Sequence, residues 1–148
     1  NEIAKQLPNV KFLWIGDGEL RKVLTSNNIQ ITGWVSREDA LKYSKNADVF
    51  LLTSLWEGLP ISLLEAMFMK KLCIVTNVIG NKDVITSGEN GFVCEKVEDF
   101  VDVIKKVQAN QSEFDYVTKE AYREILEEYN TKVMAKKYSD RYQEVLKS

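Results

Sequence analysis

The chain has 148 residues, of which 45% are hydrophobic and 28% are charged, and it carries a net charge of −2. This length and composition predict one globular domain that can bury a core, and the interspersed charges argue against a nucleic-acid-binding surface. No apolar window of about 18 residues could span a membrane, and no signal-peptide pattern opens the chain. Histidine is absent, which excludes a Ser–His or Cys–His nucleophile pair and every histidine-based metal site.

The first ten residues have the pattern of a helix end. Ile3, Ala4 and Leu7 suggest the last turn of an amphipathic helix, and Pro8 with Asn9 would end it. A chain that starts inside a helix predicts a fragment of a longer protein.

Short apolar runs then alternate with helical patterns. Strands are predicted at residues 11–15, 29–32, 49–53, 72–76 and 91–94, and helices at 19–26, 36–45 and 60–69. From Val97 the chain becomes helical, with three apolar stripes at helical spacing. All three stripes are expected to face the core, including that of the last helix, Met134, Tyr138, Tyr142 and Val145.

This alternation predicts an α/β fold: a Rossmann-like three-layer sandwich with a mainly parallel sheet, ending in several helices, in which residues 1–148 form a single domain. Ligands of such sheets bind outside the carboxyl ends of the strands. Three loops fall there, at residues 16–18, 33–35 and 54–60, and they can share one pocket. Cys73 and Cys94 lie in predicted strands and read as buried, unpaired core residues of a reducing compartment.

The stretch from Thr53 to Met67 is the strongest functional clue. Pro60 is predicted to open a helix, which would leave the backbone N–H groups of Ile61, Ser62 and Leu63 free to attract a phosphate. Glu57 precedes this helix start, and the side chain of Glu65 leans back toward it.

Carboxylates repel an anion but accept hydrogen bonds from vicinal hydroxyls. A phosphate between two hydroxyl-rich groups describes a nucleotide sugar. The alternative is that Glu65 only favours the helix start electrostatically and that Glu57 is a solvated loop residue.

The other loops are weaker signals. Gly16-Asp17-Gly18 supplies only part of a dinucleotide fingerprint, so it is either a tight turn or a loop that approaches a phosphate or sugar. Trp34 either stacks on a base or caps the sheet. Neither a Walker A sequence nor a cysteine metal motif is present, and no metal or other cofactor is expected.

These residues together resemble family 4 of the retaining glycosyltransferases, which have the GT-B fold. Glu57 to Met67 contains the E-x7-E signature of that family, and the flanking stretches match in order over about residues 8–105. They include Phe12 to Leu20, Ile31 to Val35, Ala47 to Ser54, Cys73 to Gly80 and Glu89 to Val93.

The resemblance implies the C-terminal, nucleotide-sugar-binding half of a two-domain enzyme. Glu57 would contact donor-sugar hydroxyls and act as the catalytic residue, and Glu65 would contact the ribose. The remaining donor-sugar and diphosphate positions are Gly16, Asp17, Gly18, Gly58, Leu59, Pro60, Ile61 and Ser62, and the nucleoside positions are Gly33, Trp34 and Val35. The helix around Tyr138 to Leu146 resembles the segment that returns to the N-terminal domain.

Two departures accompany this resemblance. The basic pair that neutralises the diphosphate in the family belongs to a segment upstream of the matched region, and Ile79-Gly80 stands where a Gly-Gly pair is common. The expected activity is sugar transfer from a UDP- or GDP-linked sugar to a saccharide or lipid-linked acceptor bound by an N-terminal domain. The full-length enzyme is expected in the cytoplasm, in peripheral association with the membrane. The alternatives are a nucleotide-sugar epimerase of the same fold and a non-catalytic nucleotide-binding or scaffold module.

Overall fold

The computed structural model describes residues 1–147. Its elements, in chain order, are α1 (Glu2–Gln6), β1 (Phe12–Trp14), the 3-10 helix η1 (Glu19–Val23), β2 (Ile29–Ile31), α2 (Arg37–Asn46), β3 (Val49–Leu52), α3 (Ile61–Phe68), β4 (Leu72–Thr76), α4 (Asn81–Val84), β5 (Phe92–Cys94), α5 (Val97–Ala109), the 3-10 helix η2 (Gln111–Phe114), α6 (Asp115–Glu128) and α7 (Thr131–Lys147). The α/β fold and the parallel strands expected from the sequence are confirmed.

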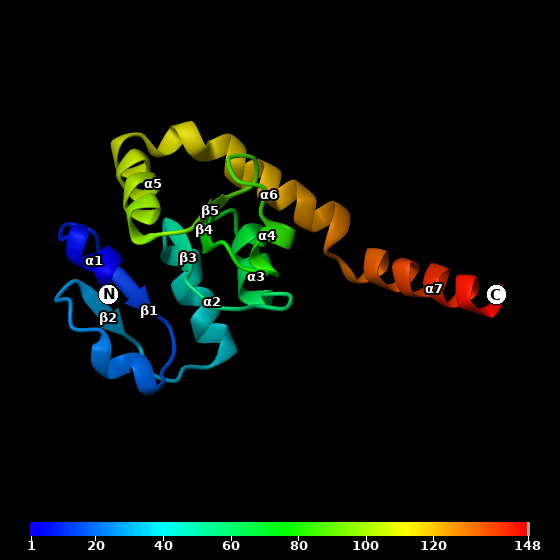
Figure 1. The fold of residues 1–148 in the computed structure, drawn as a ribbon, viewed down its shortest axis with the longest axis horizontal. Helices are drawn as coiled ribbons and strands as arrows, with labels where there is room; N and C mark the ends of the chain where they lie inside the picture. Colours follow the sequence, from blue (N-terminus) through cyan, green and yellow to red (C-terminus); the bar gives the residue numbers. More distant parts are fainter. Residues whose placement is uncertain (148) are drawn as a thin grey trace.

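The strands form two parallel ladders. β1 pairs with β2, and β3, β4 and β5 pair in that order. Figure 1 shows β1 and β2 as one unit and β3 to β5 as another, with helices around them. The five strands lie within one residue of their predicted ends, because each is a short apolar run bounded by turn residues.

Local signals also determined some helix starts. Ser36 caps α2: its Oγ accepts a hydrogen bond from the Asp39 amide at 3.1 Å and donates one to Asp39 Oδ2 at 2.8 Å. The helix predicted at residues 19–26 is wrong in type and length, since η1 is a 3-10 helix of five residues with no buried side chain. Without a buried face, a short amphipathic segment has little to stabilise a full α-helix.

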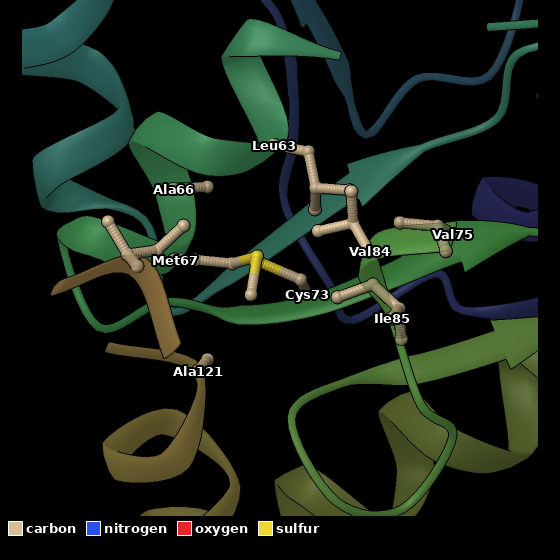
Figure 2. Close-up of a cluster of buried hydrophobic side chains, with 9 residues drawn as sticks. Leu63, Ala66, Met67, Cys73, Val75, Val84, Ile85 and Ala121 are labelled. Carbon is tan, nitrogen blue, oxygen red and sulfur yellow. The ribbon is translucent and has the colours of Figure 1, made fainter. Parts of the chain in front are cut away.

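The main core lies between α3, β4 and α6. Leu63, Ala66 and Met67 of α3 are fully buried, and Met67 packs beside Cys73 and Ala121 (Figure 2). Cys73 and Cys94 are buried free thiols, as predicted. Burial raises the pKa of the Cys73 thiol to about 12 and, with a contribution from the charge of Asp99, the pKa of the Cys94 thiol to about 11.

The N-terminal segment is held by one asparagine. The Nδ2 group of Asn28, at the entrance to β2, donates to the carbonyl oxygens of Ala4, Leu7 and Val10 at 2.8 to 3.0 Å. Leu7 is buried in the cluster that contains Phe100, Val101 and Ile104 of α5. Asn28 therefore fixes the turn between α1 and β1 beneath α5.

The C-terminal helices differ from one another. The stripes of α5 and α6 are buried, as predicted. The prediction for α7 is wrong: no residue of α7 is buried, and Met134, Tyr138, Tyr142 and Val145 are 53% to 64% exposed. Figure 1 shows α7 projecting away from the rest of the domain. No helix among residues 1–147 combines the length and apolarity needed to cross a bilayer.

Candidate functional site

Two of the three predicted loops are in contact, and a residue that follows the second contacts the helix that follows the third. Gly16 and Gly33 form an isolated bridge, which joins the loops after β1 and β2. Arg37, which follows β2, contacts Glu65 of α3, which follows β3. The carboxyl ends of β2 and β3 therefore lie on the same side, where ligands of parallel sheets bind.

Glu57 is held in place by a chain of hydrogen bonds that starts in the core. Asn81 is fully buried, and its Nδ2 donates to Thr76 Oγ1 at 3.2 Å. Thr76 Oγ1 donates to the Ser54 carbonyl at 2.6 Å, and Ser54 Oγ donates to Glu57 Oε1 at 2.6 Å. This chain restricts the loop and the carboxylate of Glu57, which is half-buried.

Gly80 makes the second contact with this loop. Its φ is +87°, and a Cβ there would lie 2.8 Å from the Glu57 carbonyl oxygen and would overlap that of Gly58. The backbone after β4 thus packs directly on the Glu57–Gly58 peptide, and only glycine allows this approach. This contact gives the Ile79-Gly80 turn a clear structural role.

The helix start differs slightly from the prediction. Pro60 is the N-cap, and α3 begins one residue later than expected, at Ile61. The Leu63 amide is not free, because it donates to the Pro60 carbonyl at 3.0 Å. Among residues 1–147, the amides of Ile61 and Ser62 have no hydrogen-bond acceptor, so the predicted anion-binding groups are reduced to these two.

Glu65 already has a charged partner. The Nε of Arg37 donates to Glu65 Oε1 at 3.1 Å, and the Nη2 group contacts the same oxygen. Glu65 is one-quarter exposed and Arg37 is largely exposed. Within the described part of the chain no protein group bonds the other oxygen, Oε2, which leaves it available to a ligand.

In the glycine turn after β1, the carboxylate of Asp17 accepts hydrogen bonds from neighbouring residues. Asp17 accepts from the Gly18 amide at 2.8 Å and from Arg21 Nη1 at 2.9 Å. The hydroxyl of Thr32 accepts from the Gly16 amide at 3.0 Å. Trp34 is 86% exposed, which contradicts a role in capping the sheet and leaves its face open.

The structure thus joins the two glycine loops through Gly16 and Gly33, and it places the other predicted residues on the loop before α3 and on α3 itself. Gly58, Leu59, Ile61 and Ser62 are exposed around Glu57, whereas Pro60 is buried. Sequence reasoning missed Arg37, Thr76 and Asn81. The small polar Thr76 at a strand end was a weak signal, but no local pattern links residues 37 and 65 or 76 and 54.

This geometry defines the class of the protein. It is an α/β domain of Rossmann-like topology with a candidate ligand site at the carboxyl ends of its strands. Residues 1–110 match the family described as "Glycosyl transferases group 1". The chain therefore belongs to this glycosyltransferase family, and the resemblance seen in the sequence is confirmed.

Two curated relatives illustrate this membership. The chain is 30% identical over 147 residues to the UDP-Gal:alpha-D-GlcNAc-diphosphoundecaprenol alpha-1,3-galactosyltransferase of Escherichia coli, covering 92% of this chain and 37% of that enzyme. It is 30% identical over 140 residues to the capsular polysaccharide biosynthesis glycosyltransferase CapM of Staphylococcus aureus, covering 88% of this chain and 34% of the relative. The chain thus spans little more than a third of these proteins.

Solved structures support the fold. Anabaena Alr3699/HepE in complex with UDP and glucose has a TM-score of 0.81 at 14% identity, covering 97% of this chain and 44% of that one. A variant of S. aureus TarM in complex with UDP has a TM-score of 0.82 at 23% identity, covering 94% of this chain and 30% of that one. Both likenesses concern the arrangement of the backbone, and they confirm the Rossmann-like fold.

Proposed function

We propose that this chain is the donor-binding domain of a retaining glycosyltransferase, which moves a sugar from a nucleoside diphosphate to a saccharide or lipid-linked acceptor. The observation that carries the proposal is the placement of Glu57: Ser54, Thr76 and the buried Asn81 hold its carboxylate beside the start of α3 through a chain of hydrogen bonds. The names of the relatives, which include a UDP-galactose-dependent enzyme, support the substrate class.

The geometry assigns a part of the substrate to each group. The amides of Ile61 and Ser62 point toward the space before α3 and suit a phosphate oxygen. Glu57 can accept hydrogen bonds from hydroxyls of the transferred sugar, and Oε2 of Glu65 can accept them from the ribose. Glu57 then raises the rate by positioning the sugar rather than by forming a covalent bond.

Arg37 has a clear electrostatic part in such a site. Two carboxylates beside a diphosphate would repel it, and the guanidinium of Arg37 offsets the charge of Glu65. The leaving diphosphate then meets a less negative environment, which favours its departure toward the side where the acceptor attacks. No metal is required by this arrangement.

Several features of the whole enzyme belong to the same proposal. The acceptor is bound by a separate N-terminal domain, the donor base is uracil or guanine, and the full-length enzyme works in the cytoplasm at the inner face of the membrane. The relatives are longer than this chain, which supports a second domain.

The test is a Glu57→Gln variant of the full-length enzyme, assayed with a panel of UDP- and GDP-linked sugars. Losing the negative charge while keeping the shape should lower kcat at least about 100-fold, with nucleotide binding retained. The matched control is Glu98→Gln, an exposed glutamate in the first turn of α5, which should leave kcat unchanged.

Other outcomes decide against the proposal. Near-wild-type turnover by Glu57→Gln contradicts the role of Glu57. Conversion of the nucleotide sugar to its epimer, without transfer, identifies an epimerase. Failure of the full-length protein to bind any nucleoside diphosphate indicates a scaffold module.

A further inference from the structure

Asn90 and Gly91 make up the single Asn–Gly step of the chain, and they lie in the turn that leads into β5. Asparagine is one of the chemically labile residues of proteins. The backbone nitrogen of the residue after it can attack its side-chain carbonyl carbon, and glycine hinders this attack least because it lacks a Cβ. Asn90 is therefore the asparagine of this chain whose sequence context favours deamidation most.

The packing of the core nevertheless requires this pair. A Cβ at Gly91 would lie 2.9 Å from the Cys73 carbonyl oxygen and 2.9 Å from Cδ1 of Ile85, so a larger residue does not fit there. Asn90 is only 2% exposed and is one of two buried polar residues among those that the structure describes. The native fold thus holds its most labile pair of residues away from water.

The side-chain amide of Asn90 is held by three hydrogen bonds. Its Oδ1 accepts from the Thr86 amide at 2.8 Å, and its Nδ2 donates to the Val84 carbonyl at 2.9 Å. Nδ2 also donates to Oε2 of Glu124 in α6. Attack by the Gly91 nitrogen needs the side chain to turn toward it, and this rotation breaks the bonds that fix the amide.

We propose that Asn90–Gly91 is a deamidation site, which the native fold keeps closed and which opening of residues 84–91 exposes. In the open segment the Gly91 nitrogen attacks Cγ of Asn90. The new N–C bond closes a succinimide ring, and Nδ2 leaves as ammonia together with the amide proton of Gly91. Water then adds to one of the two ring carbonyls and opens the ring, which gives aspartate or isoaspartate. Water is the only co-reactant, and no atom changes its oxidation state.

The product does not fit the native structure. A carboxylate at position 90 keeps an acceptor for the Thr86 amide but has no hydrogen to donate to the Val84 carbonyl. Its charge also faces the charge of Glu124. Isoaspartate adds a methylene group to the backbone just before Gly91, which already packs closely on Cys73. A deamidated chain therefore cannot recover the native packing, and the reaction makes unfolding irreversible.

The loss of the bond to Val84 also affects the candidate site. Val84 is the last residue of α4, which begins at Asn81. Asn81 and the preceding Gly80 support the loop that carries Glu57. Deamidation of Asn90 should thus loosen the element on which Glu57 rests. The chemistry at residue 90 depends on its packing alone and does not require the proposed sugar transfer.

A matched Asn–Gly step on the surface tests the protection. Ser87 is exposed and precedes Gly88, so Ser87→Asn introduces a second such step within the same tryptic peptide, residues 83–96. The full-length variant is incubated at mildly alkaline pH, both native and in guanidinium chloride, and the peptide is analysed by mass spectrometry. In the native protein, conversion at position 87 should be at least about tenfold faster than at Asn90, and in denaturant the two rates should be similar. Equal native rates, or no conversion of Asn90 in denaturant, overturn the proposal.

Refolding tests the irreversibility. The unmodified full-length protein is kept in denaturant for increasing times and then diluted. The fraction that regains the native circular dichroism, relative to protein diluted at once, should fall in step with the conversion of Asn90. Asn9 and Asn130 precede β-branched residues and should stay intact over the same time. Full refolding of converted chains, or equal conversion of Asn9 and Asn130, contradicts the proposal.

A substitution reproduces the product without the reaction. Asn90→Asp should lower the Tm of the full-length protein by about 10 °C or more. Adding Glu124→Gln should recover part of this loss, because it removes the facing charge. Asn27→Asp, at an exposed turn position before β2, is the control and should change the Tm little. Similar shifts for Asn90→Asp and Asn27→Asp, or no recovery by Glu124→Gln, contradict the roles of Asn90 and Glu124. Nucleotide binding by the unmodified protein, measured in parallel, reports on the proposed function separately.

Discussion

The region around α3, β4 and α6 and the projecting helix α7 carry the same kind of sequence pattern and have opposite environments. Met67 is fully buried in the first, whereas Met134 in the apolar stripe of α7 is 53% exposed. Apolar periodicity thus identifies an apolar face of a helix, but it does not show whether another element of the same chain packs against that face. Three pairs of variants and one test on the buried thiols can break or sharpen this comparison.

The two methionines should give the largest difference. Met67→Ala leaves a cavity among Leu63, Cys73 and Ala121, and it should lower the free energy of unfolding by about 2–5 kcal/mol. Met134→Ala should change it by less than about 0.5 kcal/mol. Urea denaturation of both variants of the 148-residue chain measures this; similar losses would mean that α7 is packed in solution.

Alanine substitutions at two glycines distinguish the destabilisation caused by a steric contact from that caused by backbone strain. Gly80 and Gly88 both have φ of +87°, but a Cβ at Gly88 meets nothing within 4 Å. Gly88→Ala should cost about 1 kcal/mol from backbone strain alone. Gly80→Ala should cost at least about 2 kcal/mol, because the Glu57–Gly58 backbone must also move. Thermal unfolding gives the two values, and equal costs would show that the contact is not retained.

Two threonine variants compare a part-buried chain of hydrogen bonds with a single exposed hydrogen bond. Thr76→Val removes the donor to the Ser54 carbonyl and the acceptor for Asn81, at a cost of about 1–2 kcal/mol. Thr118 Oγ1 donates only to the exposed Asp115 carbonyl, so Thr118→Val should be nearly neutral. Denaturant titration distinguishes them, and a neutral Thr76→Val would remove the support proposed for Glu57.

At neutral pH the thiols should give the smallest effect on stability, because they are protonated in the native and in the unfolded state. Because the raised pKa keeps Cys73 protonated in the native state up to about pH 12, unfolding releases its proton above the ordinary thiol pKa of 9.0. Stability should therefore fall gradually between pH 9 and pH 12, by at most about 1.4 kcal/mol per pH unit for this thiol. At pH 8 a thiol reagent should label a cysteine introduced by Ser139→Cys on α7 rapidly, and Cys73 and Cys94 only on unfolding. Equal labelling rates would contradict the burial.

Much of the fold follows from local pattern. The apolar runs of the five strands, the Ser36–Asp39 cap and the stripes of α5 and α6 each carry their own signal. The 3-10 form of η1 and the exposure of α7 do not, since both depend on whether another part of the protein offers a packing surface.

In the candidate site, too, some residues have a local sequence signal and others do not. Glu57, Glu65 and the helix start after Pro60 could be found from spacing, because five residues of helix bring a side chain back to its N-terminus. The Arg37–Glu65 pair joins residues 28 positions apart, and the Thr76–Ser54 bond joins residues 22 apart. Such contacts arise only when the strands are assembled, so no local pattern could indicate them.

Asn28 has a further consequence, for the order of folding. A single amide group collects three carbonyl oxygens from residues 4, 7 and 10, which lie 18 to 24 positions away along the chain. α1 and the turn after it therefore cannot reach their final conformation before the entrance to β2 has formed. The first 30 residues should therefore fold and unfold as one cooperative unit. Local unfolding should then begin after the residues that Asn28 holds together rather than at the first residue.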